Sequence, residues 1–124
     1  MAIRISIIED DDWIRENLAT QIGGTSGFQC VGKFSSAEES LDQIGHNVPD
    51  VILLDIGLPE MDGYSVARHL RSLPSMASTR IVALTGYGAE EARRMGREAG
   101  FDLHLVKPVD ADELEIALGA ARSR

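Results

Sequence analysis

The chain has 124 residues, of which 44% are hydrophobic and 26% are charged, a balance that excludes a disordered tail and fits one globular domain over residues 1–124. Its formal net charge of −8 argues against direct nucleic-acid binding, because phosphate backbones attract basic surfaces. No apolar run approaches the roughly 20 residues that span a bilayer, and the first residues lack the pattern of a secretory signal. We therefore expect a cytoplasmic location without membrane contact.

Short apolar runs alternate with helical patterns along the chain. The predicted strands are Ile3 to Ile8, Phe28 to Phe34, Val51 to Leu54, Ile81 to Leu84 and Leu103 to Val106. Apolar residues at helical spacing predict a first helix over Trp13 to Ile22, a second around Leu41 and Ile44, and a third over Tyr64 to Leu73.

Start and stop signals mark the ends of these helices. The segment Ser36–Glu39 has the form of a capping box, and Asp110–Glu113 places an acid three residues before a glutamate in the same way. Gly23–Gly24 ends the first helix, and Pro74 ends the third. A fourth helix is predicted over Ala89 to Ala99, where only Ala, Gly and Met are available for its inner face. We expect this helix to be weakly anchored.

The alternation of strands and helices predicts the fold class. Strand–helix–strand units build a parallel α/β sheet with right-handed crossovers. Three of the strands are nearly continuous in Ile, Val and Leu, as expected when both faces of a parallel sheet are covered. The sequence shows no repeat and no linker, so one domain is expected to fill the chain.

Polar side chains gather where the predicted strands end. Glu9–Asp12 follow the first strand, Asp55 the third, Thr85 the fourth and Lys107 the fifth. Ligands of open parallel sheets bind outside the carboxyl ends of the strands. Carboxylates, a hydroxyl and an ammonium are therefore expected to converge at one edge of the sheet.

Each of these groups has a chemical use. Carboxylates brought close together repel one another unless a cation joins them, and Mg²⁺ prefers oxygen ligands that phosphate oxygens complete. A carboxylate such as Asp55 can also act as the nucleophile in phosphoryl transfer. Lys107 can place a charge on a phosphate oxygen, and the Thr85 hydroxyl can donate to another.

Some of these residues have simpler interpretations. Acids that open a helix are commonly N-caps, so Asp12, and with it Asp11, is interpreted as structural. Capping does not require a run of acids, which favours metal binding for Glu9 and Asp10. Thr85 could end its strand in an ordinary turn, so the combination carries the argument and no single residue does.

The sequence resembles the receiver domains of bacterial response regulators and hybrid histidine kinases along essentially its whole length. The segments that carry the resemblance are Ile8-Glu9-Asp10-Asp11, Leu53-Leu54-Asp55-Ile56-Gly57-Leu58-Pro59-Glu60-Met61-Asp62-Gly63, Ala83-Leu84-Thr85-Gly86 and Leu105-Val106-Lys107-Pro108. Each segment alone is weak evidence for the family, whereas all four segments in this order are highly specific for it.

The resemblance implies a flavodoxin-like, three-layer, doubly wound fold with five helices and strand order 2-1-3-4-5. It implies that Glu9, Asp10 and Asp55 bind Mg²⁺, with Mn²⁺ as a possible substitute, aided by the Gly57 carbonyl. Asp55 would accept a phosphoryl group from a histidine kinase or a phosphotransfer protein. In the family, the bond between Lys107 and Pro108 is usually cis.

The resemblance also implies a signalling switch. Thr85, Gly86 and Lys107 would contact the phosphoryl group, and an aromatic side chain on the fifth strand would turn inward. The surface of the fourth helix, fifth strand and fifth helix would then change its partners, which could be an output domain, a downstream protein or a second copy of the chain. Such a domain is a phosphoacceptor whose chemistry is limited to its own phosphorylation and dephosphorylation, and not an enzyme acting on other substrates.

Three positions depart from the family pattern. The usual aromatic switch residue is His104 here, an imidazole that could rotate in the same way but also titrate near neutral pH. The two positions that tune dephosphorylation in the family are Gly57 and Tyr87. Gly57 has no side chain to orient a water molecule, whereas Tyr87 could shield the phosphate.

Other readings stay open at this point. The chain could be a stand-alone regulator, or a receiver module from a hybrid kinase or from a DNA-binding regulator. A phosphatase of the haloacid dehalogenase type also uses an aspartate at a strand tip, but its second aspartate would fall on Gly57. A flavodoxin would place its phosphate loop at Glu9–Asp12, where acids repel phosphate.

Overall fold

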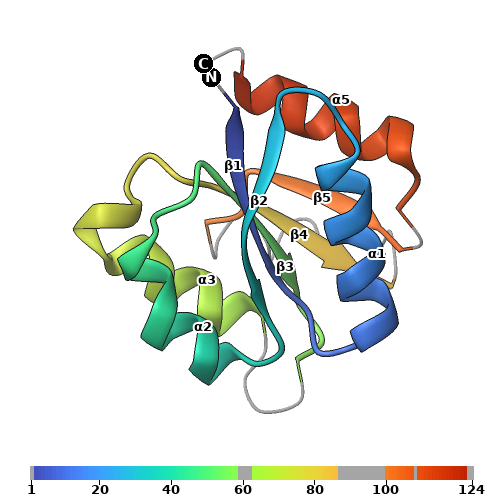
Figure 1. Cartoon of the computed structure of the whole chain (residues 1–124). Helices are drawn as coiled ribbons and strands as arrows, with labels where there is room; N and C mark the ends of the chain where they lie inside the picture. Colours follow the sequence, from blue (N-terminus) through green and yellow to red (C-terminus); the bar gives the residue numbers. More distant parts are fainter. Residues whose placement is uncertain (1, 59–62, 87–99, 108, 123–124) are drawn as a thin grey trace.

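The computed structural model describes residues 2–58, 63–86, 100–107 and 109–122 (Figure 1). Five parallel strands form one sheet in the order β2-β1-β3-β4-β5. The strands are β1 (Ile3–Ile8), β2 (Phe28–Phe34), β3 (Val51–Asp55), β4 (Arg80–Thr85) and β5 (Leu103–Val106). The predicted strand order is confirmed, and β3 and β4 each extend one residue further at the carboxyl end than the apolar pattern predicts.

Helices cover both faces of this sheet. They are α1 (Asp12–Gly23), α2 (Ala37–Gln43), α3 (Gly63–Ser72) and α5 (Ala111–Arg122), with short 3₁₀ turns η1 (Ile44–His46) and η2 (Pro74–Met76). Four of the five predicted helices are thus observed, and the predicted helix over Ala89 to Ala99 lies outside the described residues. None of the helices in the described ranges is long and apolar enough to cross a membrane.

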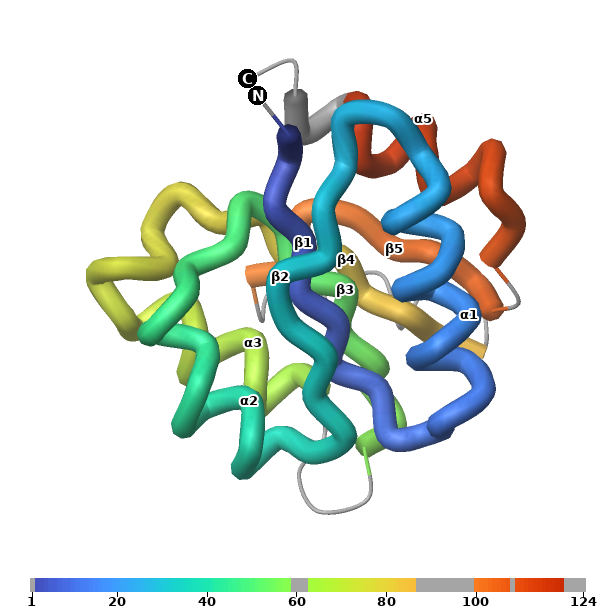
Figure 2. Tube along the Cα trace, in the orientation of Figure 1, coloured from blue at the N-terminus to red at the C-terminus, as the bar shows by residue number. Residues whose placement is uncertain are grey.

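The core is divided by the sheet into two apolar layers. Helices α1 and α5 lie on one face, and α2 and α3 lie on the other (Figure 2). Alternate strand residues point to opposite faces, so Ile7 and Leu53 pack with α1 and α5, whereas Ile52 and Leu54 pack with α2 and α3. The doubly wound, three-layer arrangement predicted from the sequence is therefore confirmed.

Capping residues begin the helices where the sequence predicts. The Ser36 side chain accepts a hydrogen bond from Glu39 N at 3.1 Å, and the Glu39 side chain accepts one from Ser35 N at 3.2 Å. At the start of α5, Asp110 Oδ1 accepts from Glu113 N at 2.7 Å. Each cap satisfies amide groups that have no partner inside the helix.

Candidate functional site at the carboxyl ends of the strands

Parallel pairing brings the predicted site residues to one edge of the sheet. Asp55 is the last residue of β3 and Thr85 the last of β4, while Glu9 and Lys107 directly follow β1 and β5. Glu9 and Asp55 are 0% and 6% exposed, so two carboxylates are buried side by side. Buried carboxylates need compensation by a cation or by hydrogen-bond donors.

Lys107 joins these two carboxylates. Its Nζ lies 2.6 Å from Glu9 Oε1 and 3.2 Å from Asp55 Oδ1. The Lys107 backbone amide donates to Thr85 O at 2.8 Å, which continues the pairing of β5 with β4 past the end of the strand. The side chain is thereby directed back over the sheet edge toward β1 and β3.

Glu9 is held by the beginning of α1. Its Oε2 accepts a hydrogen bond from Asp11 N at 3.2 Å, and its backbone carbonyl accepts one from Arg15 Nη1 at 2.9 Å. Asp11 is the N-cap of α1, and its side chain accepts from Ile14 N at 2.9 Å. Asp12 lies in the first turn and pairs with Arg15. These two acids therefore serve the helix, as their position predicts.

Asp55 is held by the chain that follows it. Gly57 N donates to Asp55 Oδ1 at 2.9 Å, and Gly63 N donates to Ile56 O at 3.0 Å. A Cβ at Gly63 would lie 2.4 Å from the Cα of Ile56 and 2.9 Å from the carbonyl oxygen of Asp55. Glycine is thus required for the start of α3 to approach the backbone beside Asp55 so closely.

The pKa values of the three charged groups are shifted, and not all in the same direction. Burial raises the pKa of Glu9 to about 7, against the opposing effect of Lys107. Burial would also raise the pKa of Asp55, but the Gly57 amide, Glu9 and Lys107 outweigh it and hold that pKa below its usual value. The pKa of Lys107 is raised, because the two carboxylates outweigh its own desolvation. Asp55 therefore ionises at lower pH than Glu9, although Lys107 lies closer to Glu9.

Three carboxylates at this edge could hold a metal ion. One oxygen from each of Glu9, Asp10 and Asp55 lies within 4.8 Å of the others. Asp10 is exposed, so the group opens to solvent on that side. Clustered carboxylates with room for water are the donor set that Mg²⁺ prefers. Burial is the largest cause of the raised pKa of Glu9 and disfavours its ionised form, and a bound cation would favour that form.

The remaining predicted residues differ in how closely they approach this group. Thr85 is 2% exposed at the tip of β4, and Gly86 follows it at the surface. His104 is half-buried on β5, with its ring 5.9 Å from that of Phe101. Tyr87 and Pro108, and with Pro108 the predicted cis bond, lie outside the described residues.

Comparison with known proteins identifies the family. The model of the response regulator receiver domain matches residues 5–119. The chain belongs to this family. Response regulator Rre1 of Synechocystis sp. is 32% identical over 113 residues, which cover 91% of this chain and 48% of the relative. This receiver domain therefore spans about half the length of that curated relative.

Solved structures agree with this assignment. A protein of Chloroflexus aurantiacus, provisionally named a response regulator, is 32% identical to this receiver domain, and the match covers all of both chains with a TM-score of 0.91. The chemotaxis response regulator CheY4 of Vibrio cholerae, at 22% identity, shares the fold, with a TM-score of 0.90 over 98% of this chain and 99% of the other. The chain is thus a receiver domain of two-component signalling with a CheY-like fold.

Two supporting residues of the site escaped the sequence analysis. Arg15 lies one helical turn beyond the acidic run and could only be read as a surface charge. Gly63 belongs to a segment that carries the family resemblance, but the close backbone approach that requires it is visible only in three dimensions. The sequence signal that could have pointed to Gly63 is a glycine at the start of a strongly amphipathic helix.

Proposed function

We propose that Asp55 accepts a phosphoryl group from the phosphohistidine of a histidine kinase or phosphotransfer protein in a Mg²⁺-dependent reaction. The observation that carries this proposal is the meeting of Glu9, Asp10 and Asp55, whose oxygens lie within 4.8 Å of one another, with the ammonium of Lys107. An ordinary turn would not bury an aspartate and a glutamate together at the tips of two parallel strands.

The chain's own residues supply most of what the transfer needs. The lowered pKa of Asp55 keeps its carboxylate ionised, which is the form that attacks phosphorus. The new O–P bond forms as the N–P bond of the phosphohistidine breaks, and the electron pair of that bond returns to the imidazole. Lys107 and the Thr85 hydroxyl would then contact phosphoryl oxygens. Bound Mg²⁺, or Mn²⁺ in its place, held by Glu9, Asp10, Asp55 and the Gly57 carbonyl, would neutralise charge on those oxygens.

The proposal includes a change of surface on phosphorylation. Thr85 would move toward the phosphoryl group, and the His104 side chain would rotate inward on β5. The face of the fourth helix, β5 and α5 would then bind an output domain, a downstream protein or a second copy of the chain. The exposed apolar side chains Leu103, Val106 and Ile116, which are 40%, 37% and 74% exposed, support a binding role for this face. We place these events in the cytoplasm.

Incubation with Mg²⁺ and acetyl phosphate, followed by intact mass measurement, tests the proposal. We expect one added phosphoryl group, which is absent without Mg²⁺ and absent in Asp55→Asn. Asp42→Asn on α2 removes one carboxylate from an exposed position and should be labelled like the wild type. Labelling that persists in Asp55→Asn would refute the assignment.

Incubation with phosphate monoesters in place of acetyl phosphate separates the proposed function from a phosphatase. A receiver consumes one phosphodonor for each slow cycle of its own aspartyl phosphate. Rapid multiple turnover on unrelated phosphate monoesters would instead indicate an enzyme of the haloacid dehalogenase type. We expect no such turnover, because the position of that enzyme's second aspartate is Gly57, which offers no acid.

A further inference from the structure

Arg15 lies near the start of α1, with its guanidinium turned toward the end of β1. Its Nη1 donates to the backbone carbonyl of Glu9 at 2.9 Å, while Nη2 lies 2.5 Å from Asp12 Oδ1 and Nε lies 3.6 Å from Glu16 Oε2. The Arg15 side chain is 13% exposed, whereas those of Asp12 and Glu16 are 87% and 54% exposed. Ion pairs with exposed acids contribute little free energy, so the contact that accounts for the inward position of the guanidinium is the one with Glu9.

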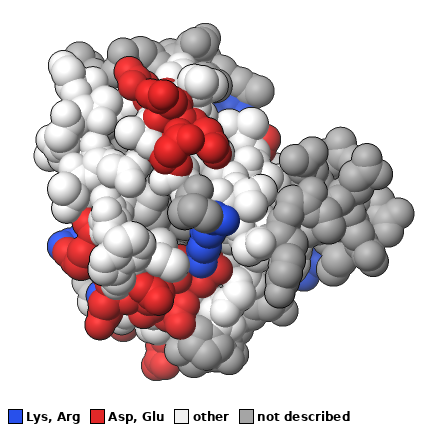
Figure 3. Space-filling view, turned by 90° about the vertical axis from the view of Figure 1, so that its right-hand side faces the viewer, with Lys and Arg blue, Asp and Glu red and all other residues white. Residues whose placement is uncertain are grey.

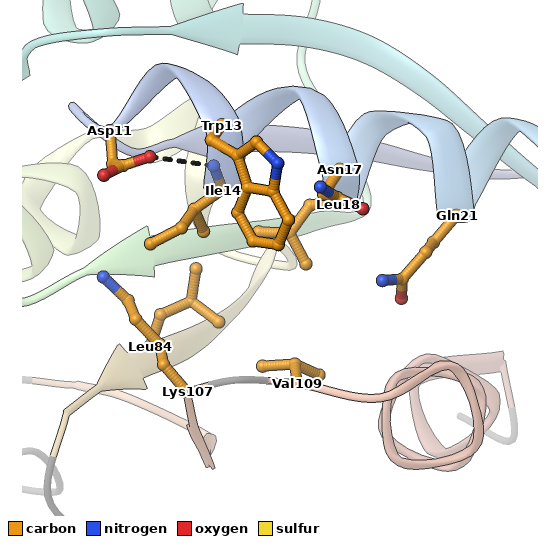
Figure 4. A pocket seen from close by; sticks show the side chains of 9 residues that line it. All are labelled: Asp11, Trp13, Ile14, Asn17, Leu18, Gln21, Leu84, Lys107 and Val109. Atoms are coloured by element: carbon orange, nitrogen blue, oxygen red, sulfur yellow. Dashed lines mark hydrogen bonds between the residues drawn. The ribbon is translucent and has the colours of Figure 1, made fainter.

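The turn between β1 and α1 is held from both sides. On the strand side, the Glu9 amide donates to Phe34 O of β2 at 3.0 Å. On the helix side, Glu9 Oε2 accepts from Asp11 N at 3.2 Å, and the Glu9 carbonyl accepts from Arg15. Asp11 also caps α1 through the Ile14 amide, as drawn in Figure 4. The hydrogen bond from Arg15 therefore ties the backbone that directly follows β1 to a side chain of α1.

Asp10 occupies the middle of this turn. Its carboxylate is exposed and makes no hydrogen bond or ion pair with a residue that the structure describes. One of its oxygens nevertheless lies within 4.8 Å of oxygens of Glu9 and Asp55. Because no side-chain contact fixes this carboxylate, the backbone of the turn determines its position. A group that fixes that backbone therefore determines how the three carboxylates are spaced.

The charge of Arg15 and its effect on the turn act on a bound cation in opposite directions. A guanidinium whose Nη1 lies 2.9 Å from the Glu9 backbone repels a cation held by the neighbouring carboxylates. Attraction at longer range is already abundant, since Figure 3 shows acidic side chains gathered on the face that carries α1 and α5. Groups that orient the ligands of a metal typically change its affinity by about 10–100-fold, so we expect the placement of the carboxylates to outweigh the repulsion.

We propose that Arg15 is a positioning residue of the metal site: by holding the Glu9 carbonyl to α1, it fixes the turn that presents Asp10 and Glu9 to a divalent cation. The inference rests on the proposed binding of Mg²⁺ by these carboxylates. Asp12 supports this role, because it holds another nitrogen of the guanidinium and compensates its charge. Arg15 acts on the cation only through the two residues that it positions.

Calorimetric titration of the protein with Mg²⁺ tests this role without a phosphodonor. The titration is carried out at about pH 8, above the pKa of about 7 of Glu9, so that proton release contributes little to the heat. We expect Arg15→Ala to weaken Mg²⁺ binding by about tenfold, although it removes a positive charge near the site. Arg68→Ala, which removes an arginine from an exposed position on α3, should bind Mg²⁺ like the wild type.

Arg15→Lys separates placement from charge. Lysine keeps the positive charge but replaces the planar guanidinium by a single ammonium, and we expect Mg²⁺ binding about threefold weaker than in the wild type. Circular dichroism establishes that each variant is folded. Unchanged or tighter binding in a folded Arg15→Ala would overturn the inference and leave the proposed function intact. If Arg15→Ala does not fold, wild-type affinity in Arg15→Lys would overturn it instead. A wild-type protein that binds no Mg²⁺ would overturn both.

Discussion

The carboxylates at the two edges of the sheet differ in how well hydrogen-bond donors and positive groups match them. At the amino ends of the strands, Asp102 accepts from Arg71 Nη2 at 2.5 Å, from Arg80 Nη1 at 3.3 Å and from Ile81 N at 2.9 Å. Asp50 accepts there from Arg4 N at 2.9 Å. At the carboxyl ends, Glu9 and Asp55 share the ammonium of Lys107, and Asp10 adds a third carboxylate to the group.

The amino edge of the sheet stabilises the fold, whereas the carboxyl edge holds the candidate functional site. Each carboxylate of the amino edge has donors that match it, and Arg71 also donates to the carbonyls of Gly100 and Thr79, so the network fixes α3 to the beginning of β5. The carboxyl edge carries surplus negative charge, which costs free energy until a cation arrives. Groups with perturbed pKa values gather at functional sites for this reason.

The largest effect is expected at the amino edge. Asp102→Ala removes one acceptor from each of two guanidinium groups and from the Ile81 amide, and we expect the free energy of unfolding to fall by about 3 kcal/mol. Urea denaturation followed by circular dichroism measures this loss. Phosphorylation of the folded variant by acetyl phosphate should continue. A loss below about 0.5 kcal/mol would mean that the network contributes little.

At the carboxyl edge, removing a charge should raise the free energy of unfolding, which is the opposite of the effect expected at the amino edge. The pKa of Glu9 is raised from 4.5 to about 7 in the folded protein. Its contribution to stability is therefore fully present below about pH 4.5 and is lost as the pH rises through about 7. Glu9→Gln cannot lose a proton, and we expect it to stabilise the metal-free protein by about 2 kcal/mol at about pH 8, with little effect near pH 4.

Urea denaturation in the presence of a chelator at several pH values checks this expectation. The difference between Glu9→Gln and the wild type isolates Glu9 from the other carboxylates, whose own pH dependence is common to both proteins. Glu115→Gln, an exposed change on α5, serves as the matched control. Destabilisation of Glu9→Gln at high pH would show that the ion pair with Lys107 outweighs the cost of burial.

A smaller effect is expected from Gly57. A Cβ at this position would lie 3.6 Å from Asp55 Oδ1, an ordinary contact distance, so a side chain can be added without displacing the backbone. Gly57→Asn would place a carboxamide where it can orient a water molecule toward the aspartyl phosphate. We expect dephosphorylation to accelerate by about fivefold, corresponding to about 1 kcal/mol, as measured by the decay of the phosphorylated mass. Gly57→Ala should change it less.

The smallest effect is expected from His104→Phe. The ring is half-buried and tilted against Phe101, and a phenyl group preserves that packing, so stability should change by less than about 0.5 kcal/mol. Phosphorylation should still shift the amide resonances of β5 in nuclear magnetic resonance spectra. Loss of that shift in a phosphorylated variant would show that the imidazole itself is needed for the switch.

The sequence predicted the residues at the carboxyl edge of the sheet better than the network at the amino edge. Glu9, Asp55 and Lys107 follow apolar strands, and parallel pairing forces such positions together. Arg71 and Asp102 are 31 residues apart and follow no pattern, because their contact depends on how α3 packs against the sheet. The last residues of β3 and β4 were also missed, since Asp55 and Thr85 are polar but remain in the strand ladder.

The position of Lys107 has a consequence for how a metal ion enters. Its Nζ already lies between Glu9 and Asp55, so the resting domain carries an internal counter-ion. Metal uptake would then be an exchange in which the ammonium yields part of its contact and Glu9, when protonated, releases its proton. The heat of binding should therefore depend on the ionisation enthalpy of the buffer below about pH 7, and that dependence should disappear in more alkaline solution.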